Sequence, residues 1–152
     1  MQVMWRPLLV NFEVPAKPPG VWTKVLDYVG PSRKLRFIAS GTWYWQDPSS
    51  LSGSDAASTT SETRCECGPD GDLSATLSKG CLTQDAPVGA LIGKIGGSSA
   101  TVQNTGAFVV GAFCVYDISD AMKGPLFLTI NDMPAGMSDN NGKIVVSIWE
   151  AV

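Results

Sequence analysis

Histidine is absent from this 152-residue sequence, and its absence removes several reaction classes at once. Without an imidazole, neither a Ser-His-Asp nor a Cys-His catalytic arrangement can form, and the commonest general base near neutral pH is missing. A hydrolase would have to use a pair of carboxylates, which the 14 acidic residues allow by number. These acids fall mostly in expected loops, and no pair has a spacing typical of catalysis. We therefore expect a protein that is not an enzyme, with a two-carboxylate glycosidase as the remaining enzymatic alternative.

Charge and long apolar runs are also scarce. Charged residues make up 16% of the chain, compared with about 25% in typical globular domains. The net charge of -3 and the pI of about 4.8 predict no basic surface for the phosphates of nucleic acid. No apolar run is long enough for a membrane-spanning helix, so no membrane insertion is expected. The N-terminal stretch lacks the basic and apolar regions of a signal peptide, which predicts a soluble chain made in the cytoplasm, for which any release or export would use a leaderless route.

The four cysteines are too few for a disulfide scaffold at this length. Cys65 and Cys67 are too close together to pair with each other, so any bridge is expected to join one of them to Cys81. A thiolate zinc site is the alternative, although paired C-x-x-C units and histidines are both missing. Cys114 lies within an apolar segment and is expected to be a small buried hydrophobe.

What the sequence does contain is 16 glycines, 10 prolines and short segments rich in β-branched and aromatic residues. Such segments separated by turn signals predict strands. The candidates are Pro7 to Val14, Val21 to Val29, Lys34 to Gly41, Gly89 to Gly96, Ala107 to Tyr116, Gly124 to Asn131 and Lys143 to Ala151. Seven or eight strands predict an all-β protein, a jelly-roll-like β-sandwich of two antiparallel sheets in a single domain over residues 1–152. The small polar stretch Ser49 to Thr63 is expected to be a surface loop, and Asp117 to Gly124 a connector with a single helical turn.

The last two candidate strands alternate clearly between two faces. In the first, Leu126, Leu128 and Ile130 share one face, and in the second, Ile144, Val146 and Ile148 do so. We predict that these strands pair as a wide hairpin. The loop Asp132 to Gly142 would then project from one end of the sheet.

This loop, DMPAGMSDNNG, is rich in hard oxygen ligands from two aspartates and two asparagines. Ca²⁺ takes about six to eight oxygens from carboxylates, amides and backbone carbonyls. The glycines and proline of the loop permit a tight path that could aim several oxygens at one point. The spacing is not that of an EF-hand, because Pro134 stands at the third position and no glutamate at the twelfth. An ordinary long hairpin loop would have a similar composition, so a calcium site and a plain turn both remain open.

Several fragments resemble, in order and spacing, the LecA-like (PA-I type) galactophilic, calcium-dependent lectins of bacteria. The fragments are FIASGTWYW (Phe37 to Trp45), GPDGD (Gly68 to Asp72), GALIGKIG (Gly89 to Gly96), NTGAF (Asn104 to Phe108) and LTINDMPAGMSDNNGKIVVSI, which contains the loop. The resemblance covers about three quarters of the chain and leaves the Ser-rich stretch as an insertion.

The resemblance implies one bound Ca²⁺ whose coordination is completed by vicinal hydroxyls of a terminal galactose. Side-chain ligands would be Asp132, Asp139 and Asn140, and backbone carbonyl ligands would be Gly136 and Trp45, with Tyr44 as the neighbour of Trp45. Since several weak sites gain from avidity, a homo-oligomer, either a dimer or a tetramer, is expected.

The expected sugar contacts are Asp132, Met133, Asp139, Asn140 and Tyr44. Trp43, Tyr44, Trp45 and Met133 are available to cover the apolar face of a sugar ring, although each is equally compatible with a core role.

Two departures from the family pattern bear on specificity. The family has Asn where this chain has Asp139, and the loop LSATLSKG (Leu73 to Gly80) lacks the His and Gln of the family's galactose pocket. The alternative is therefore a LecA-like sandwich with a structural calcium that serves a protein-protein assembly without sugar binding.

Overall fold

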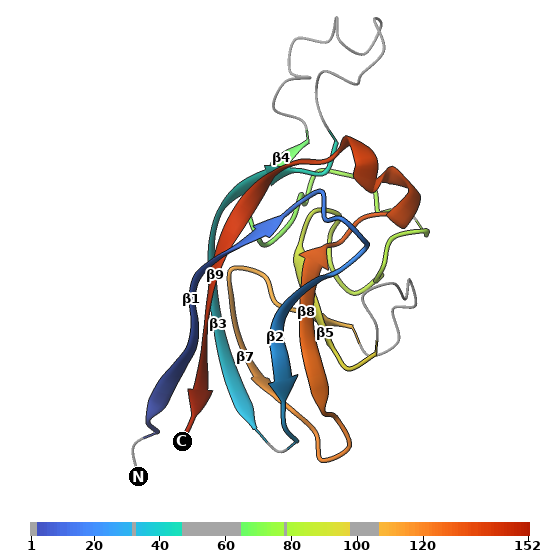
Figure 1. The fold of residues 1–152 in the computed structure, drawn as a ribbon. Helices are drawn as coiled ribbons and strands as arrows, with labels where there is room; N and C mark the ends of the chain where they lie inside the picture. The colour runs from blue at the N-terminus through green and yellow to red at the C-terminus, as the bar shows by residue number, and fades with distance from the viewer. Residues whose placement is uncertain (1–2, 32, 47–64, 78, 98–106) are drawn as a thin grey trace, which may run out of the picture.

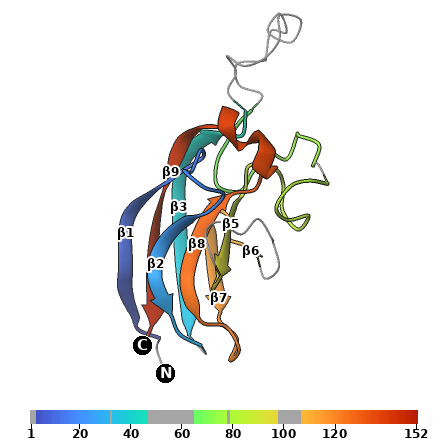
Figure 2. The ribbon, with the colours of Figure 1, turned by 45° about the vertical axis from the view of Figure 1, so that its right-hand side comes forward.

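The computed structural model describes residues 3–31, 33–46, 65–77, 79–97 and 107–152. Within these residues, nine strands form two antiparallel sheets that pack face to face as two layers (Figures 1 and 2). This arrangement confirms the predicted jelly-roll-like β-sandwich. The Ser-rich stretch 49–63 lies outside the described residues.

The strand order differs between the two sheets. In the first sheet, β9 (Asn141–Ala151) lies between β1 (Trp5–Pro15) and β3 (Lys34–Tyr44), and the far edge of β3 pairs with both β7 (Phe113–Asp117) and β4 (Glu66–Cys67). The second sheet has the order β2 (Thr23–Val29), β8 (Gly124–Ile130), β5 (Leu91–Ile95) and β6 (Phe108–Val109). Both chain ends lie at one end of the sandwich, and the loop between β8 and β9 lies at the other (Figure 1).

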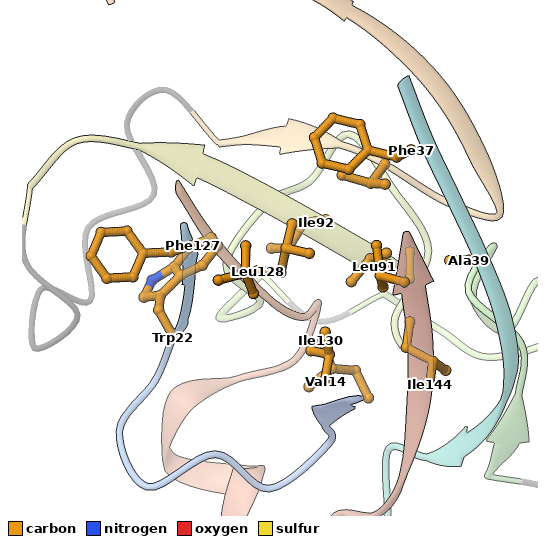
Figure 3. Packing of buried hydrophobic residues seen from close by; sticks show 14 of the residues in the cluster. Val14, Trp22, Phe37, Ala39, Leu91, Ile92, Phe127, Leu128, Ile130 and Ile144 are labelled. Carbon is orange, nitrogen blue, oxygen red and sulfur yellow. The ribbon is translucent and has the colours of Figure 1, made fainter. Parts of the chain in front are cut away.

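The core fills the space between the two sheets. From β9, Ile144, Val146 and Ile148 are fully buried, as the alternation in the sequence predicted. They contribute to the same buried cluster as Leu126, Leu128 and Ile130 of β8, as Figure 3 shows for several members. Each such side chain contributes about 1.5–3 kcal/mol by leaving water, so this layer holds the sheets together and fixes their register.

The prediction that β8 and β9 form a hairpin is wrong. β8 pairs with β2 and β5, whereas β9 pairs with β1 and β3 in the opposite sheet. Both arrangements bury the alternating apolar residues of the two strands, so alternation alone cannot distinguish strands that pair from strands that face each other across a core. The loop after β8 therefore crosses from one sheet to the other at the end of the sandwich.

The prediction of a single strand over Ala107 to Tyr116 is also wrong, because this segment forms two strands in different sheets. β6 ends at Val109, the chain turns at Gly111 with φ +67°, and β7 begins at Phe113. The carboxylate of Asp70 accepts a hydrogen bond from the Ala112 amide at 2.8 Å, and a Cβ at Gly111 would lie 2.6 Å from Asp70 Oδ1. Asp70 thus fixes the point at which the chain changes sheets.

The helical turn expected within Asp117 to Gly124 is a hydrogen-bonded turn from Ser119 to Met122, and the crossing loop instead contains the 3-10 helix η2 (Pro134–Asp139). Of the cysteines, all of which lie in the described part, none forms a disulfide, and Cys114 is half-buried against the core. Among the described residues, no helix is long and apolar enough to span a membrane.

Candidate functional site

Asn131, which connects β8 to the crossing loop (residues 132–140), anchors this loop through a fully buried side chain that sequence reasoning missed. Its Oδ1 accepts a hydrogen bond from the Thr83 amide, and its Nδ2 donates to the carbonyls of Thr83, Ala86 and Pro87 at 3.0–3.1 Å. One side chain therefore holds residues 83–87 against the end of β8. The only signal in the sequence was an asparagine directly after a buried strand.

The next residue, Asp132, is buried with 5% of its surface exposed. Its Oδ1 accepts the Met133 amide at 2.7 Å, while its Oδ2 is buried without a hydrogen-bond partner. Burial raises the pKa of the Asp132 carboxyl from 3.8 to about 6, and the charge of Asp139 adds to the increase, while the Met133 amide and the nearby Asn140 side chain oppose it. A buried carboxylate oxygen without a donor is costly unless a proton or a cation neutralises it.

The other end of the loop carries a second oxygen of this kind. Asn140 is 3% exposed, and its Nδ2 donates to the Ala16 carbonyl at 2.9 Å. That hydrogen bond fixes which way the amide points, because a carbonyl accepts only from the nitrogen. Oδ1 of Asn140 is left buried without a partner. Two oxygen acceptors at the two ends of one loop thus lack donors.

Gly136 and Asp139 lie in η2 between these two residues. A Cβ at Gly136 would meet Asp132 Oδ1 at 3.9 Å, so the backbone of η2 passes close to the carboxylate. Asp139 is near enough for its charge to raise the pKa of Asp132. The structure therefore brings together Asp132, Gly136, Asp139 and Asn140, the four predicted ligand residues of this loop.

The fifth predicted ligand residue, Trp45, follows the end of β3. Register pairing places the preceding residue, Tyr44, opposite Asn141, the first residue of β9, which follows Asn140 directly. The backbone amide of Trp45 donates to the Cys65 carbonyl, and its indole Nε1 donates to Asp72 Oδ2, both at 3.0 Å. Trp45 is thus at the same end of the sandwich, and its side chain takes part in a separate hydrogen-bond network.

The candidates for covering a sugar ring fall in different environments. Trp43 is fully buried and donates from Nε1 to the Gly89 carbonyl at 2.7 Å, so its proposed availability for a sugar is wrong. Tyr44 follows Trp43 in β3 and points to the opposite face of the sheet, where its hydroxyl donates a hydrogen bond to Glu66 Oε2 at 3.2 Å. Met133 is 40% exposed directly beside Asp132 and is the apolar side chain best placed to contact a ligand there.

The neighbouring GPDGD segment is structural in both of its aspartates. Asp70 fixes the crossover described above, and Asp72 accepts hydrogen bonds from the Ser74 amide and hydroxyl and from Trp45. Burial alone would raise the pKa of Asp72, but these hydrogen bonds and that of the Ala75 amide outweigh it and hold the pKa below its usual value. Asp72 is therefore a satisfied carboxylate, unlike Asp132.

A cation in the crossing loop would be bound by mixed oxygen ligands. In the described part of the chain, no three His, Cys, Asp or Glu side chains form a group that could hold a metal. The oxygens that lack donors belong to one carboxylate and one amide, which is a donor set typical of Ca²⁺ rather than of zinc. For Cys67, burial raises the thiol pKa to about 12, which disfavours the thiolate that zinc requires.

Comparison with known proteins then identifies the family. The sequence model of the PA-IL-like protein family matches residues 55–151, which is well over half of the chain and includes the crossing loop and both flanking strands. The chain belongs to the PA-IL-like family. This membership confirms the resemblance to LecA-like lectins that the loop and strand fragments indicated. No curated protein matches the chain.

Among solved structures, this PA-IL-like chain is similar to one described as "EclA N-terminal domain; PllA-like lectin". The TM-score is 0.59, the sequence identity is 17%, and the alignment covers 97% of each chain. At this identity the likeness concerns the fold, which it shares over nearly its whole length.

Proposed function

We propose that the protein is a calcium-dependent lectin that binds terminal galactose-like sugars and catalyses no reaction. The observation that carries the proposal is the pair of buried oxygens without donors, Oδ2 of Asp132 and Oδ1 of Asn140, at the two ends of one crossing loop. Membership of the PA-IL-like family and the lectin fold of the structural neighbour support carbohydrate binding.

The chemistry of the loop fits Ca²⁺. Side-chain oxygens would come from Asp132, Asp139 and Asn140, and backbone carbonyls from Gly136 and Trp45. These donors are fewer than the six to eight oxygens that Ca²⁺ usually takes, so positions remain for ligand hydroxyls. When bound, the ion supplies coordination for two adjacent hydroxyls of a sugar. The carboxylates of Asp132 and Asp139 can also accept hydrogen bonds from those hydroxyls.

Sugar contacts beyond the ion depend on the residues around it. Met133 is exposed beside Asp132 and can cover the apolar face of a sugar ring. The pairing of β3 with β9 places Tyr44 opposite Asn141, the residue directly after the proposed ligand Asn140. The loop from Leu73 to Gly80 replaces the family's His and Gln, and Leu73 is 86% exposed. We expect this apolar residue to make the preference for galactose less strict.

The test is a thermal melt of the full chain in chelator, in Ca²⁺, and in Ca²⁺ with galactose. We expect Ca²⁺ to raise Tm and galactose to raise it further, since any ligand of the native state stabilises it. Asp132→Asn should abolish both shifts. The matched control is Asp85→Asn, which removes the same charge from an exposed position in the neighbouring loop and should preserve both shifts.

Each other result points to a different function. A shift with Ca²⁺ but none with galactose or on a glycan array would contradict the lectin proposal and favour a structural ion in a protein assembly. Turnover of an aryl galactoside that survives chelation would instead indicate a glycosidase. Light scattering of the purified chain tests the proposed dimer or tetramer.

A further inference from the structure

A cavity lies at the end of the sandwich opposite to the crossing loop, between the ends of the two sheets. Its volume is about 240 Å³, and its lining includes Arg6, Arg33 and Glu150 with apolar walls from Leu26 and Leu35. Glu150 is nine residues beyond Asn141 along β9, which corresponds to about 30 Å of strand. The cavity is therefore separate from the crossing loop, and chelation of a metal there does not act on it directly.

Glu150 is the buried centre of this cavity, with 10% of its side chain exposed. Its Oε2 lies 3.2 Å from Arg6 Nη2, and its Oε1 lies 2.8 Å from Arg33 Nη1. Register pairing with both Arg6 and Leu35 holds Glu150 in the middle of the sheet. A buried carboxylate requires such partners, so part of the arrangement is structural.

The two arginines nevertheless provide more than Glu150 needs. Two positive charges against one negative charge leave the cluster with one excess positive charge, in a chain whose net charge is -3. The Arg6 and Arg33 side chains are 60% and 54% exposed, and a guanidinium carries five N–H donors. Donors and positive charge therefore remain available at the mouth of the cavity.

The remaining features define which anion fits. One excess charge matches a monoanionic carboxylate better than a phosphate dianion, which the nearby Glu150 would repel. A carboxylate oxygen accepts more than one hydrogen bond, so Glu150 can also accept from ligand hydroxyls. Leu26 and Leu35 provide an apolar surface for ring carbons, and the exposed ring of Tyr28 lies at the wall. The volume is below the usual range for drug-sized ligands and suits a single ring.

We propose that this cavity binds a small hydroxylated monocarboxylate of the uronic acid type. The ligand carboxylate pairs with Arg6 and Arg33, its hydroxyls donate to Glu150, and its ring packs against Tyr28 and the leucines. This site is independent of the proposed calcium site. The chain would then recognise a neutral sugar at one end and an acidic sugar at the other.

The test is a titration of the ¹⁵N-labelled full chain in chelator with glucuronate, followed by two-dimensional NMR. We expect saturable shifts of the backbone amides of Tyr28, Gly30 and Arg33, and none in residues 132–140. Methyl glucoside, which lacks the carboxylate, should produce no shifts, and benzoate, which lacks the hydroxyls, should bind at least tenfold more weakly. Absence of saturable shifts with glucuronate overturns the proposal, and equal binding of benzoate or inorganic phosphate overturns the ligand class.

Two variants separate binding from stability. Arg33→Gln should weaken glucuronate binding at least tenfold, whereas Lys143→Gln should leave it unchanged. Lys143 is the matched control because it is 57% exposed and pairs with a glutamate, Glu13, near the other end of β9. Since Arg33→Gln also removes a partner of buried Glu150, Tyr28→Ala provides a second variant at an exposed position. Tyr28→Ala should weaken binding without changing Tm, and unchanged affinity in both variants contradicts the proposal.

Discussion

Replacing Asp132 by Asn is expected to stabilise the protein in the absence of divalent metal. The substitution keeps the shape of the side chain and the acceptor for the Met133 amide, and it removes a negative charge that is buried. A site that exists only to stabilise the fold would not carry this penalty, because an uncharged residue of the same size is available.

The magnitude follows from the pKa of Asp132. The folded-state value of about 6 lies roughly two units above the value near 3.9 for an unfolded chain. Each unit corresponds to about 1.4 kcal/mol, so the ionised carboxylate lowers the free energy of unfolding by about 2–3 kcal/mol above pH 7. For a domain of this size, the equivalent shift in Tm is about 5–10 °C.

The pH dependence has a definite sign. Above about pH 7 the residue is ionised in both states, and the full penalty applies, because the pKa of the folded state is about 6. Between about pH 6 and pH 4 the folded protein binds a proton that the unfolded chain does not, so the stability of the wild type rises as the pH falls. The Asn variant lacks this contribution. Its advantage should therefore be largest at neutral pH and should disappear near pH 4.

The assay is urea unfolding of both proteins in chelator over this pH range, with Asp85→Asn as the control for loss of an exposed charge. Comparing variants at each pH cancels the titration of the other groups. An Asn variant that is less stable than the wild type at neutral pH, or an advantage that does not change with pH, would refute the reasoning. Addition of Ca²⁺ should reverse the order, because only the wild type retains the carboxylate.

Two further predictions concern the scaffold around the crossing loop. Gly89→Ala should destabilise the fold by about 3 kcal/mol or more, because Gly89 has φ +89° and an added Cβ would lie 2.4 Å from Cys67 Sγ. The control is Gly30→Ala, whose added Cβ would approach nothing closer than 3.6 Å. This control should be nearly neutral in thermal melts. Asn131→Ala should lower the free energy of unfolding in urea by about 3 kcal/mol, because its buried amide satisfies several backbone groups, and a change equal to that of the exposed control Asn141→Ala would contradict this role.

The strands and their buried faces could be predicted because alternation is a local property. The buried positions of β9 follow directly from the two-residue period of the sequence. Strand pairing could not be predicted in the same way. The alternation of apolar residues expected in β8 and β9 is the same whether the two strands are neighbours in one sheet or face each other across the core. Only long-range packing decides between these arrangements.

The same limit applies to the break between β6 and β7. The run from Ala107 to Tyr116 is apolar throughout, so no polar residue marks the change of sheet. The decisive contact comes from Asp70, which lies 42 positions from its partner Ala112. A glycine at 111 was the one local signal, and it is equally compatible with a bulge within a strand.

In the candidate site, the oxygen-rich composition of the crossing loop could be recognised from the sequence, and the resemblance to LecA-like lectins implied Asp132, Gly136, Asp139 and Asn140 as its candidate ligands. The anchors that position them could not be recognised in this way. Asn131 acts on residues 83–87, and Asn140 is oriented by the Ala16 carbonyl, 124 positions away. Trp43 was misjudged for a similar reason, since one position along β3 separates a fully buried indole from a half-buried tyrosine.

The route of the crossing loop has a mechanical consequence. One end is attached to β8 in the second sheet, and the other continues into β9 in the first, so the segment links the two sheets covalently at the end of the sandwich. A ligand that binds between the two ends of this segment would therefore stabilise the contact between both sheets, and its dissociation would weaken that contact. The resistance of the whole domain to unfolding should consequently increase in proportion to the occupancy of the loop.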